Sequence, residues 1–368
     1  MQIDLRNRFA NRRHTGVAVR ERATIKDVAA RAGVSTTTVS HVLSGQRPVS
    51  AVTAARVRQA VQETGYRPAA IARSMRTRRT ETVALIVPDI ANPFYPAVAR
   101  GLHDALVGHG YRTLIGSTDG QRGAELGFLE DVVARSVDGI LLFGHALDAE
   151  DLRTVVGGRV PIVLSSDLGA GEHDRVVVDD VEGAEAATAH LLAAGVTEIA
   201  FLSGPKGLGP GDWRLAGYLR ALGAAGLAAP EDHIVRGDYT AESGRRAVGR
   251  LLAGGAPPRA VICANDLMAI GALRAAHEAG VAVPDGLAVV GFDDIDAAAL
   301  VRPALTTVAL PAYEIGRRSG ELLLARMSGG PSAGEPPREE VLRTQLVVRE
   351  STPPLATEAG EPNGGEQT

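Results

Sequence analysis

The sequence predicts an α-helical amino-terminal domain followed by an α/β body that contains two parallel sheets. Two short helical patterns flank a glycine within residues 24–45. From Thr82 onward, apolar runs without polar alternation are separated by helical stretches, which is typical of parallel strands covered on both faces. This alternation starts again near Glu198, which favours two sheets of similar build over a single one.

Residues 24–45 predict two short helices joined by a tight turn. Thr24 is placed to cap the first helix, and Asp27 three residues later completes a capping box. The apolar face of this helix consists of Ile25, Val28, Ala29 and Ala32. Gly33 ends the helix, because glycine readily adopts the left-handed conformation of a sharp turn. Ser35 is placed to cap the second helix, whose apolar side consists of Val39, Val42 and Leu43.

The opposite side of the second helix is polar and is predicted to face outward. It carries Thr36, Thr37, Ser40 and His41. Small hydroxyl side chains and an imidazole can reach base edges in the major groove of DNA. A generic helical hairpin is the alternative, but helix, glycine turn and polar second helix together favour a helix-turn-helix. The predicted DNA contacts of this motif are Thr24, Ser35, Thr36, Thr37, Thr38, Ser40 and His41.

A third helix is predicted from its cap at Ser50 to Gly65, and it completes a small DNA-binding domain at residues 23–67. The side chains that it buries are Val57, Ala60 and Val61.

Residues 1–22 hold six arginines and little apolar periodicity, so they are predicted to form a disordered basic arm. The arm either adds nonspecific phosphate contacts or reflects a misassigned start codon.

Charge is distributed unevenly along the chain. Residues 1–80 hold 16 Arg or Lys against 4 Asp or Glu, whereas the remaining residues hold 23 basic and 39 acidic ones. A basic front on an acidic body indicates that the front binds a polyanion and that the body does not. A basic tail without a target is the alternative, and the helix-turn-helix inside the basic block argues against it.

The body is predicted to alternate strands and helices. Strands are expected at residues 83–87, 113–115, 140–143, 162–164, 176–178, 199–202, 261–263 and 289–292, and a last strand is expected at residues 343–348. Helices are expected at residues 96–109, 123–134, 183–194, 215–225, 243–253 and 267–279. Two open α/β lobes of this kind place a ligand in the cleft between them, at the carboxyl ends of the strands.

Polar and aromatic residues near the predicted strand ends are candidates for that cleft. Arg214 begins a helix after a glycine-rich loop, where a guanidinium can donate a pair of hydrogen bonds to hydroxyls or to a carboxylate. Asp293 ends a buried strand, although it or Asp294 can instead cap the next helix. One residue of the Asn265–Asp266 pair is expected to cap the helix that follows. The aromatic candidates are Phe94, Tyr95, Tyr239 and Trp213, and the weakest candidates are Asp179 and Asp180.

The front of the chain resembles the lactose/galactose repressor (LacI/GalR) family. The resemblance rests first on Thr-Ile-Lys-Asp-Val-Ala from Thr24, followed by Ala-Gly-Val-Ser, Thr-Val-Ser and Val-Leu. It continues through Val49-Ser50, Gly65-Tyr66-Arg67-Pro68 and Ile71-Ala72-Arg73-Ser74-Met75, and it extends to about Ser351.

The resemblance implies how the rest of the chain is organised. Residues 68–80 would form a hinge helix and linker, and residues 81–351 a periplasmic-binding-protein-like body that binds an effector and dimerises. The body's chain would cross between its lobes near residues 180, 310 and 340. Residues 352–368 would be a disordered tail, and they lack the leucine heptads by which some members form tetramers.

The resemblance also implies partners and contacts. The family's hinge folds on operator DNA and wedges an apolar side chain into the minor groove; Met75 occupies that position, and Arg73 is counted with it as a DNA contact. The effector contacts that the resemblance implies are Arg214, Tyr239, Asn265 and Asp293. Phe94 and Tyr95 are expected to wall the cleft because they begin the first helix of the first lobe. We therefore expect a homodimeric repressor on a near-palindromic operator, controlled by a small ligand. A carbohydrate is favoured, and a purine or other corepressor is the alternative.

Signals for other classes of function are poor. The sequence lacks a phosphate-binding G-x-x-x-x-G-K-[ST] motif, its histidines lack metal-ligand spacing, and Cys263 is its single cysteine. We therefore expect no catalytic residue, metal or cofactor. An exported sugar receptor would need a signal segment and would lack the basic front. Without such a segment or a long apolar run, we expect a cytoplasmic, nucleoid-associated protein with no membrane partner.

Overall fold

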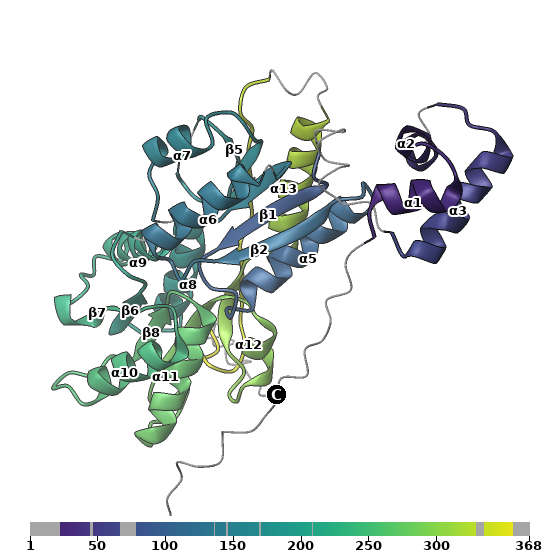
Figure 1. Ribbon diagram of the computed structural model, residues 1–368. Coiled ribbons are helices and arrows are strands. Elements are labelled where there is room, and N and C mark those ends of the chain that lie inside the picture. The colour runs from purple at the N-terminus through teal and green to yellow at the C-terminus, as the bar shows by residue number, and fades with distance from the viewer. Residues whose placement is uncertain are drawn as a thin grey trace, which may run out of the picture. The chain divides into compact units, whose positions relative to one another are not determined.

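The computed structural model in Figure 1 describes residues 23–44, 47–66, 79–135, 137–144, 146–168, 171–207, 209–328 and 335–355. The chain divides into two units, Met1–Arg78 and Arg79–Thr368, which we describe separately. The predictions for the basic arm at residues 1–22 and for Arg73 and Met75 in the hinge fall outside the described residues.

Three helices surround a small core in the first unit: α1 (Ile25–Ala32), α2 (Thr36–Ser44) and α3 (Ala51–Thr64). The core consists of Val28, Ala29, Ala32, Val39, Val57 and Ala60. The predicted caps are confirmed. The Thr24 amide donates to Asp27 at 2.7 Å, and the Ser35 and Ser50 hydroxyls accept from backbone amides three residues on. Gly33 has a φ of 61°, as a left-handed turn requires. Leu43 was expected on the apolar side, but it is 39% exposed, whereas Val42 beside it packs against the core.

The second unit contains two sheets, as predicted. Within the described residues, each sheet has six strands. The first sheet has the order β11-β5-β4-β3-β1-β2, with bounds Glu339–Leu342, Asp174–Val178, Ile162–Leu164, Gly139–Leu142, Thr82–Val87 and Arg112–Ser117. The second has the order β12-β10-β9-β8-β6-β7, with bounds Gln345–Val347, Thr306–Ala309, Ala288–Asp293, Ala260–Cys263, Ile199–Ser203 and Ile234–Arg236. The pairing is parallel throughout, except that β12 runs antiparallel to β10.

Helices cover both sheets. Their bounds are α5 (Phe94–Val107), α6 (Arg122–Ala134), α7 (Ala149–Val155), α8 (Asp180–Ala193), α9 (Gly211–Ala224), α10 (Ala241–Leu252), α11 (Asp266–Glu278), α12 (Asp296–Leu300) and α13 (Ala312–Met327), with a short 3-10 turn at Glu231–His233. Three pairs of these helices lie side by side: α5 with α13, α8 with α9, and α10 with α11. The described part of the chain has no helix that is long and apolar enough to span a bilayer.

The chain crosses between the two lobes three times, at the places that the resemblance implied. It leaves the first sheet after β5 and enters α8, which packs on β10 and β12 of the second sheet. It returns after β10 into α13, which packs on α5 and the first sheet, and it crosses again from β11 to β12. Figure 1 shows the two lobes, with β1, β2 and α13 in one and β6, β8 and α11 in the other. Each lobe therefore contains segments that are distant in sequence.

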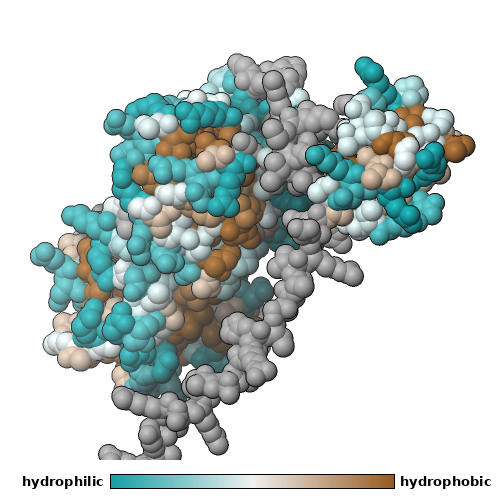
Figure 2. Space-filling model, viewed as in Figure 1, coloured by the Kyte–Doolittle hydropathy of each residue, from teal (hydrophilic) through white to brown (hydrophobic). Residues whose placement is uncertain are grey.

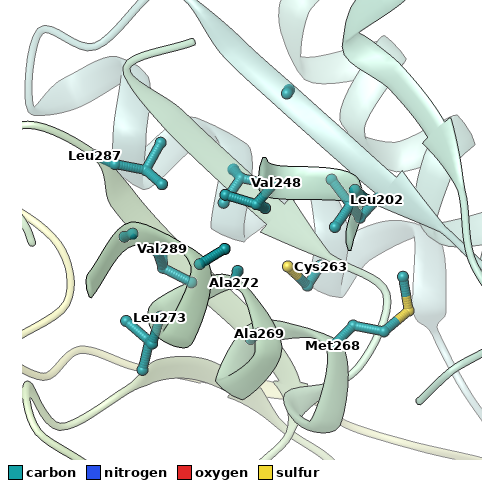
Figure 3. Close-up of a cluster of buried hydrophobic side chains, with 14 of the residues drawn as sticks. Leu202, Val248, Cys263, Met268, Ala269, Ala272, Leu273, Leu287 and Val289 are labelled. Atoms are coloured by element: carbon teal, nitrogen blue, oxygen red, sulfur yellow. The ribbon is translucent and has the colours of Figure 1, made fainter. Parts of the chain in front are cut away.

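Each lobe has its own hydrophobic core. In the second lobe, side chains of α11 pack against strands β8 and β9, as Figure 3 shows for Cys263, Ala272 and Val289. The Cys263 thiol is fully buried, and this burial raises its pKa, so the thiol is held in its uncharged form. Its environment is that of a core side chain.

The carboxyl-terminal segment is folded further than predicted. The tail was expected to begin at residue 352, but Thr352 is only 3% exposed. Its hydroxyl lies 3.0 Å from His190 Nε2 and 2.9 Å from the Thr306 hydroxyl, and Ser351 bonds to Val289 on β9. The Pro/Gly/Glu-rich composition that suggested a tail begins only after these contacts. Residues 356–368 lie outside the described part of the chain.

Candidate functional site

The exposed side of α2 is the candidate DNA-reading surface. Ser35, Thr36 and Thr37 are exposed, and Thr24 is exposed at the start of α1. The Thr38 hydroxyl lies 2.9 Å from the Ser35 hydroxyl, so these two side chains serve the cap of α2. Ser40 and His41 are half-buried further along the helix. Lys26, Arg47 and Arg58 of the same unit are exposed cations of the kind that contacts phosphates.

A second candidate site lies between the two lobes, where the carboxyl ends of the strands of both sheets meet. This cleft has a volume of about 430 Å³, which suits a small molecule. The first lobe contributes residues that follow β1, β2 and β3, and the second lobe contributes residues that follow β6, β7, β8 and β9. All six predicted effector residues line it: Phe94, Tyr95, Arg214, Tyr239, Asn265 and Asp293.

Arg214 is the centre of a buried polar cluster in the second lobe. It lies in the first turn of α9 and is 4% exposed. Its Nε donates to Asp180 at 2.7 Å, and Nη1 donates to the Ala264 carbonyl and lies 3.5 Å from Asp293. Its guanidinium carbon lies 3.8 Å from the ring centre of Phe292. Burial alone would lower the Arg214 pKa, but the two carboxylates raise it overall, so the guanidinium is charged.

Asp293 ends β9 and points into the same cluster. Burial raises its pKa to about 7, against the opposing effects of Arg214 and of a hydrogen bond with Asn92. Asn92 belongs to the first lobe, so its side chain acts on the Asp293 carboxyl from the other side of the cleft. The Asn92 Oδ1 accepts from the Phe94 amide at 3.0 Å, which holds the asparagine at the start of α5.

Aromatic rings form the apolar wall of the cleft. Phe94, Tyr95 and Phe143 of the first lobe contact one another edge to face, with ring centres 5.2 to 6.1 Å apart. Burial raises the Tyr95 pKa, so its hydroxyl is neutral. Tyr239 lies opposite in the second lobe with a φ of 64°, and its hydroxyl accepts from the Gly211 amide at 3.0 Å. These rings give a ligand flat apolar surfaces on both lobes.

Other predicted candidates take different positions. Asn265 lines the cleft and also caps α11, because its Oδ1 accepts from the Met268 amide and its Nδ2 donates to the Tyr239 carbonyl. Asp179 caps α8. Asp294 pairs with Arg349 at 2.6 Å and does not line the cleft. Asp180 was ranked among the weakest candidates, yet it lines the cleft and binds Arg214.

Sequence reasoning missed several residues of the cleft. They are Asp89, Asn92, Asp119, Phe143 and Asp238. Asp89, Asp119 and Phe143 follow β1, β2 and β3 closely, and Asp238 follows β7. A systematic search of the residues just after each predicted strand would have found Asp89 and Asp119, but not Phe143, because the predicted strand at residues 140–143 included it. Strand β7 was not predicted, so its end carried no such signal.

A helical unit with a polar recognition surface and a two-lobed body with a ligand-sized cleft together define a ligand-responsive DNA-binding regulator. Comparison with known proteins agrees with this class. Residues 24–69 match the family described as bacterial regulatory proteins, lacI family, and residues 188–352 match the periplasmic binding protein-like domain. The chain belongs to the LacI family of transcriptional regulators.

The matched relatives are similar over most of their lengths. The HTH-type transcriptional repressor CytR of Escherichia coli (strain K12) is 37% identical over 90% of this chain and 96% of its own. Catabolite control protein A of Priestia megaterium is 35% identical over 83% and 92%. Among solved structures, the lac repressor dimer bound to operator and the anti-inducer ONPF has a TM-score of 0.78 at 27% identity, over 90% and 99%. The CelR–cellobiose complex has a TM-score of 0.66 at 35% identity, over 90% and 100%.

Proposed function

We propose that this protein is a homodimeric transcriptional repressor that reads an operator with α2 and whose affinity for that operator is set by a small ligand between its lobes. The observation that carries the proposal is the cleft itself. Its walls come from both lobes, so a bound ligand contacts both and favours one arrangement of them over another. Catalysis has no part in this function, and a repressor of chromosomal genes acts in the cytoplasm.

A carbohydrate is the ligand class that we favour. Hydroxyl groups match the carboxylates and amides of the cleft, and sugar rings pack well on aromatic side chains. Two similar structures support this class, because one is a complex with cellobiose and another, a regulator from Enterococcus faecium, has bound ribose. The aromatic walls also favour a second candidate, a ligand with a planar base such as a nucleoside.

Dimerisation is supported by exposed apolar side chains on the first lobe. Strand β2 is an edge strand, and its Leu114 and Ile115 are about two-fifths exposed, as is Ile90, whose amide bonds to Ser117 on the same strand. Figure 2 shows hydrophobic residues at the surface of this part of the body. A two-fold dimer gives the paired reading heads that a near-palindromic operator requires.

The experiment that tests the proposal selects an operator from a random DNA library and then measures its affinity by fluorescence anisotropy. We expect Thr37→Ala to weaken operator binding by about 1–3 kcal/mol and to relax the preference at one base position. Gln62→Ala, an exposed polar residue of α3, is the matched control and should leave the affinity unchanged. If Thr37→Ala keeps both affinity and selectivity, α2 does not read the DNA as proposed.

The ligand is tested on the same complex. A panel of sugars and nucleosides is screened by thermal shift, and each compound that raises the melting temperature is then added to the protein–operator complex. At least one of these compounds should change the operator affinity. If none of those that bind changes it, the cleft does not control DNA binding.

A further inference from the structure

The charge of the cleft limits the kind of ligand that it accepts. Five carboxylates line it: Asp89, Asp119, Asp180, Asp238 and Asp293. Among the described residues of the lining, Arg214 is the single cationic side chain. Even with Asp293 protonated, carboxylates outnumber the cation four to one. The field inside such a cleft repels anions, and its apolar walls strengthen that repulsion.

The one guanidinium is already committed to protein groups. Arg214 bonds to Asp180 and to the Ala264 carbonyl, lies beside Asp293, and rests on the Phe292 ring. Two buried carboxylates thus balance its single charge. A phosphate or carboxylate on a ligand would have to displace one of these carboxylates, and the displaced group would remain buried without its partner.

Backbone amides at the starts of four helices around the cleft also have protein acceptors. Helix amino termini attract anions when their amides are free. Here the Asn92 side chain accepts from the first turn of α5, and the Tyr239 hydroxyl accepts from the Gly211 amide of α9. Asp179 and Asn265 cap α8 and α11. These four amides are therefore satisfied by protein acceptors, and three of the acceptors belong to uncharged residues of the lining: Asn92, Tyr239 and Asn265.

Two arginines that lie close to acidic residues of this region are also paired. Arg236 lies 2.5 Å from Asp212, and Arg246 lies 3.9 Å from Asp238, and neither arginine lines the cleft. Lys206 is exposed in the loop before α9, and its positive charge acts on the Asp212 carboxylate. With Asp212 and these three cations counted together with the lining, six carboxylates still stand against four cations.

We propose that the cleft discriminates against anionic ligands, so that the effector is an unphosphorylated, uncharged or cationic compound and its phosphate ester is rejected. This inference rests on the proposed function and narrows its ligand. A phosphotransfer reaction that esterifies a hydroxyl of the effector consumes the signal, because the product no longer fits the charge of the cleft. The regulator then reports the free compound and not its phosphorylated product.

The sole tryptophan of the chain, Trp213, lines the cleft and gives a direct test of its charge. Collisional quenching of its fluorescence is measured with Cs⁺, iodide and neutral acrylamide at one constant ionic strength. The acrylamide data are used to correct for the intrinsic quenching efficiencies. The corrected quenching constant for Cs⁺ should then exceed that for iodide by about threefold or more. Iodide quenching equal to or stronger than corrected Cs⁺ quenching would overturn the proposal.

Matched variants locate the source of this preference. Asp89→Asn with Asp119→Asn keeps the side-chain shape, and asparagine tolerates the left-handed backbone of Asp119. This double variant should lower the preference for Cs⁺. The control, Asp232→Asn with Asp285→Asn, removes the same charge from exposed positions before the amino ends of strands β7 and β9. It should leave the preference for Cs⁺ unchanged. Equal effects of both pairs would show that net charge, and not the cleft, sets the quenching.

A second arm uses ligands directly. D-Ribose, D-glucose, adenosine and cytidine are each compared with their 5- or 6-phosphate esters by Trp213 fluorescence and thermal shift. Any compound of this set that binds should bind at least tenfold more tightly without its phosphate. A phosphate ester that binds more tightly than its parent refutes the charge rule. The proposed function itself fails by separate outcomes: bound ligands that leave operator affinity unchanged, or a Thr37→Ala variant that keeps both affinity and selectivity.

Discussion

Asp293 has an unusual backbone conformation for a residue with a side chain. Its φ is 112° and that of Asp294 is 58°, both in the region that favours glycine. The Leu310 amide donates to the Asp293 carbonyl at 3.3 Å, and Arg349 holds the Asp294 carboxylate at 2.6 Å. Strain of this kind persists only where surrounding contacts fix it, and it concentrates at binding sites. At this position it directs the Asp293 carboxylate toward Arg214 and the cleft.

The raised pKa of Asp293 predicts a pH dependence of stability. Because this pKa is about 7 in the folded chain against 3.8 for an ordinary aspartate, the folded state binds the proton more tightly. The resulting stabilisation is complete below pH 3.8 and is lost as the pH rises through about 7. The wild type should lose at most roughly 4 kcal/mol of unfolding free energy in this way as the pH rises. The Asp293→Asn variant should not show this loss.

Urea denaturation of the wild type and of Asp293→Asn between pH 4 and pH 8 measures this effect. The difference between their unfolding free energies isolates Asp293 from histidines that titrate in the same range. A difference that stays constant with pH would show that Asp293 is ionised throughout and that its burial is compensated.

Single positions of the cleft were predictable where a residue follows a strand that is clear in the sequence as an apolar run. Asn265 and Asp293 end the apolar runs of β8 and β9, so their place at the sheet edge follows from parallel pairing. The resemblance supplied the placement of Arg214. The partner of Arg214 was not predictable, because Asp180 is 34 residues away and belongs to the first helix after a lobe crossing. Only the folded second lobe brings the two together.

At the scale of elements, glycines allow the paired helices to approach each other closely. A Cβ on Gly316 of α13 would lie 2.0 Å from the Val98 carbonyl oxygen of α5. A Cβ on Gly101 of α5 would lie 1.9 Å from the Tyr313 carbonyl oxygen of α13. Gly271 of α11 has the same relation to Ala241 of α10. Since these neighbours are backbone atoms, they cannot move aside without separating the helices.

Gly316→Ala should therefore destabilise the body by about 1–3 kcal/mol, even though alanine has the higher helix propensity. Gly127→Ala in α6 is the control, because a Cβ there meets nothing within 4 Å. It should be neutral or stabilise the body by up to about 1 kcal/mol. Thermal and urea unfolding of both variants provide the comparison, and similar changes for the two would disprove the close approach of α5 and α13.

The carboxyl-terminal segment Arg349–Thr352 closes the second lobe. Truncation before Arg349 should lower the free energy of unfolding by about 1–3 kcal/mol or more, because it leaves the buried His190 and Thr306 side chains without their Thr352 partner. Truncation after Leu355 retains these bonds and should leave stability unchanged. Equal melting temperatures for the two truncated chains would mean that the segment does not stabilise the lobe.

Strands and helices were predictable to different degrees for physical reasons. Strands buried on both faces, such as β1 and β9, appear as continuous apolar runs. The missed strands lack that signal: β7 has three half-buried or exposed residues, β11 begins with two glutamates, and β10 begins with two threonines. Pairing with neighbours, rather than their own composition, makes these segments strands.

At the scale of the whole molecule, the repeat of the strand–helix pattern predicted two sheets but not how their parts are distributed. Strands β11 and β12 are three residues apart in sequence, yet they complete different sheets. Helix α13 follows a strand of the second sheet but packs on the first lobe. Local sequence contains no information about such exchanges, because each segment is compatible with either sheet until tertiary packing selects one.

The two units should unfold separately in the free protein. The first unit has its own core of six small hydrophobic residues, whereas the second has several larger clusters. A small domain buries too little apolar surface to be very stable. Differential scanning calorimetry should therefore show two transitions, with that of the first unit at the lower temperature. The chain that begins at residue 79 should retain only the upper transition. Operator DNA binds the folded first unit and should raise the lower transition before the upper one. A single transition that shifts as a whole when DNA is added would show that the two units fold as one.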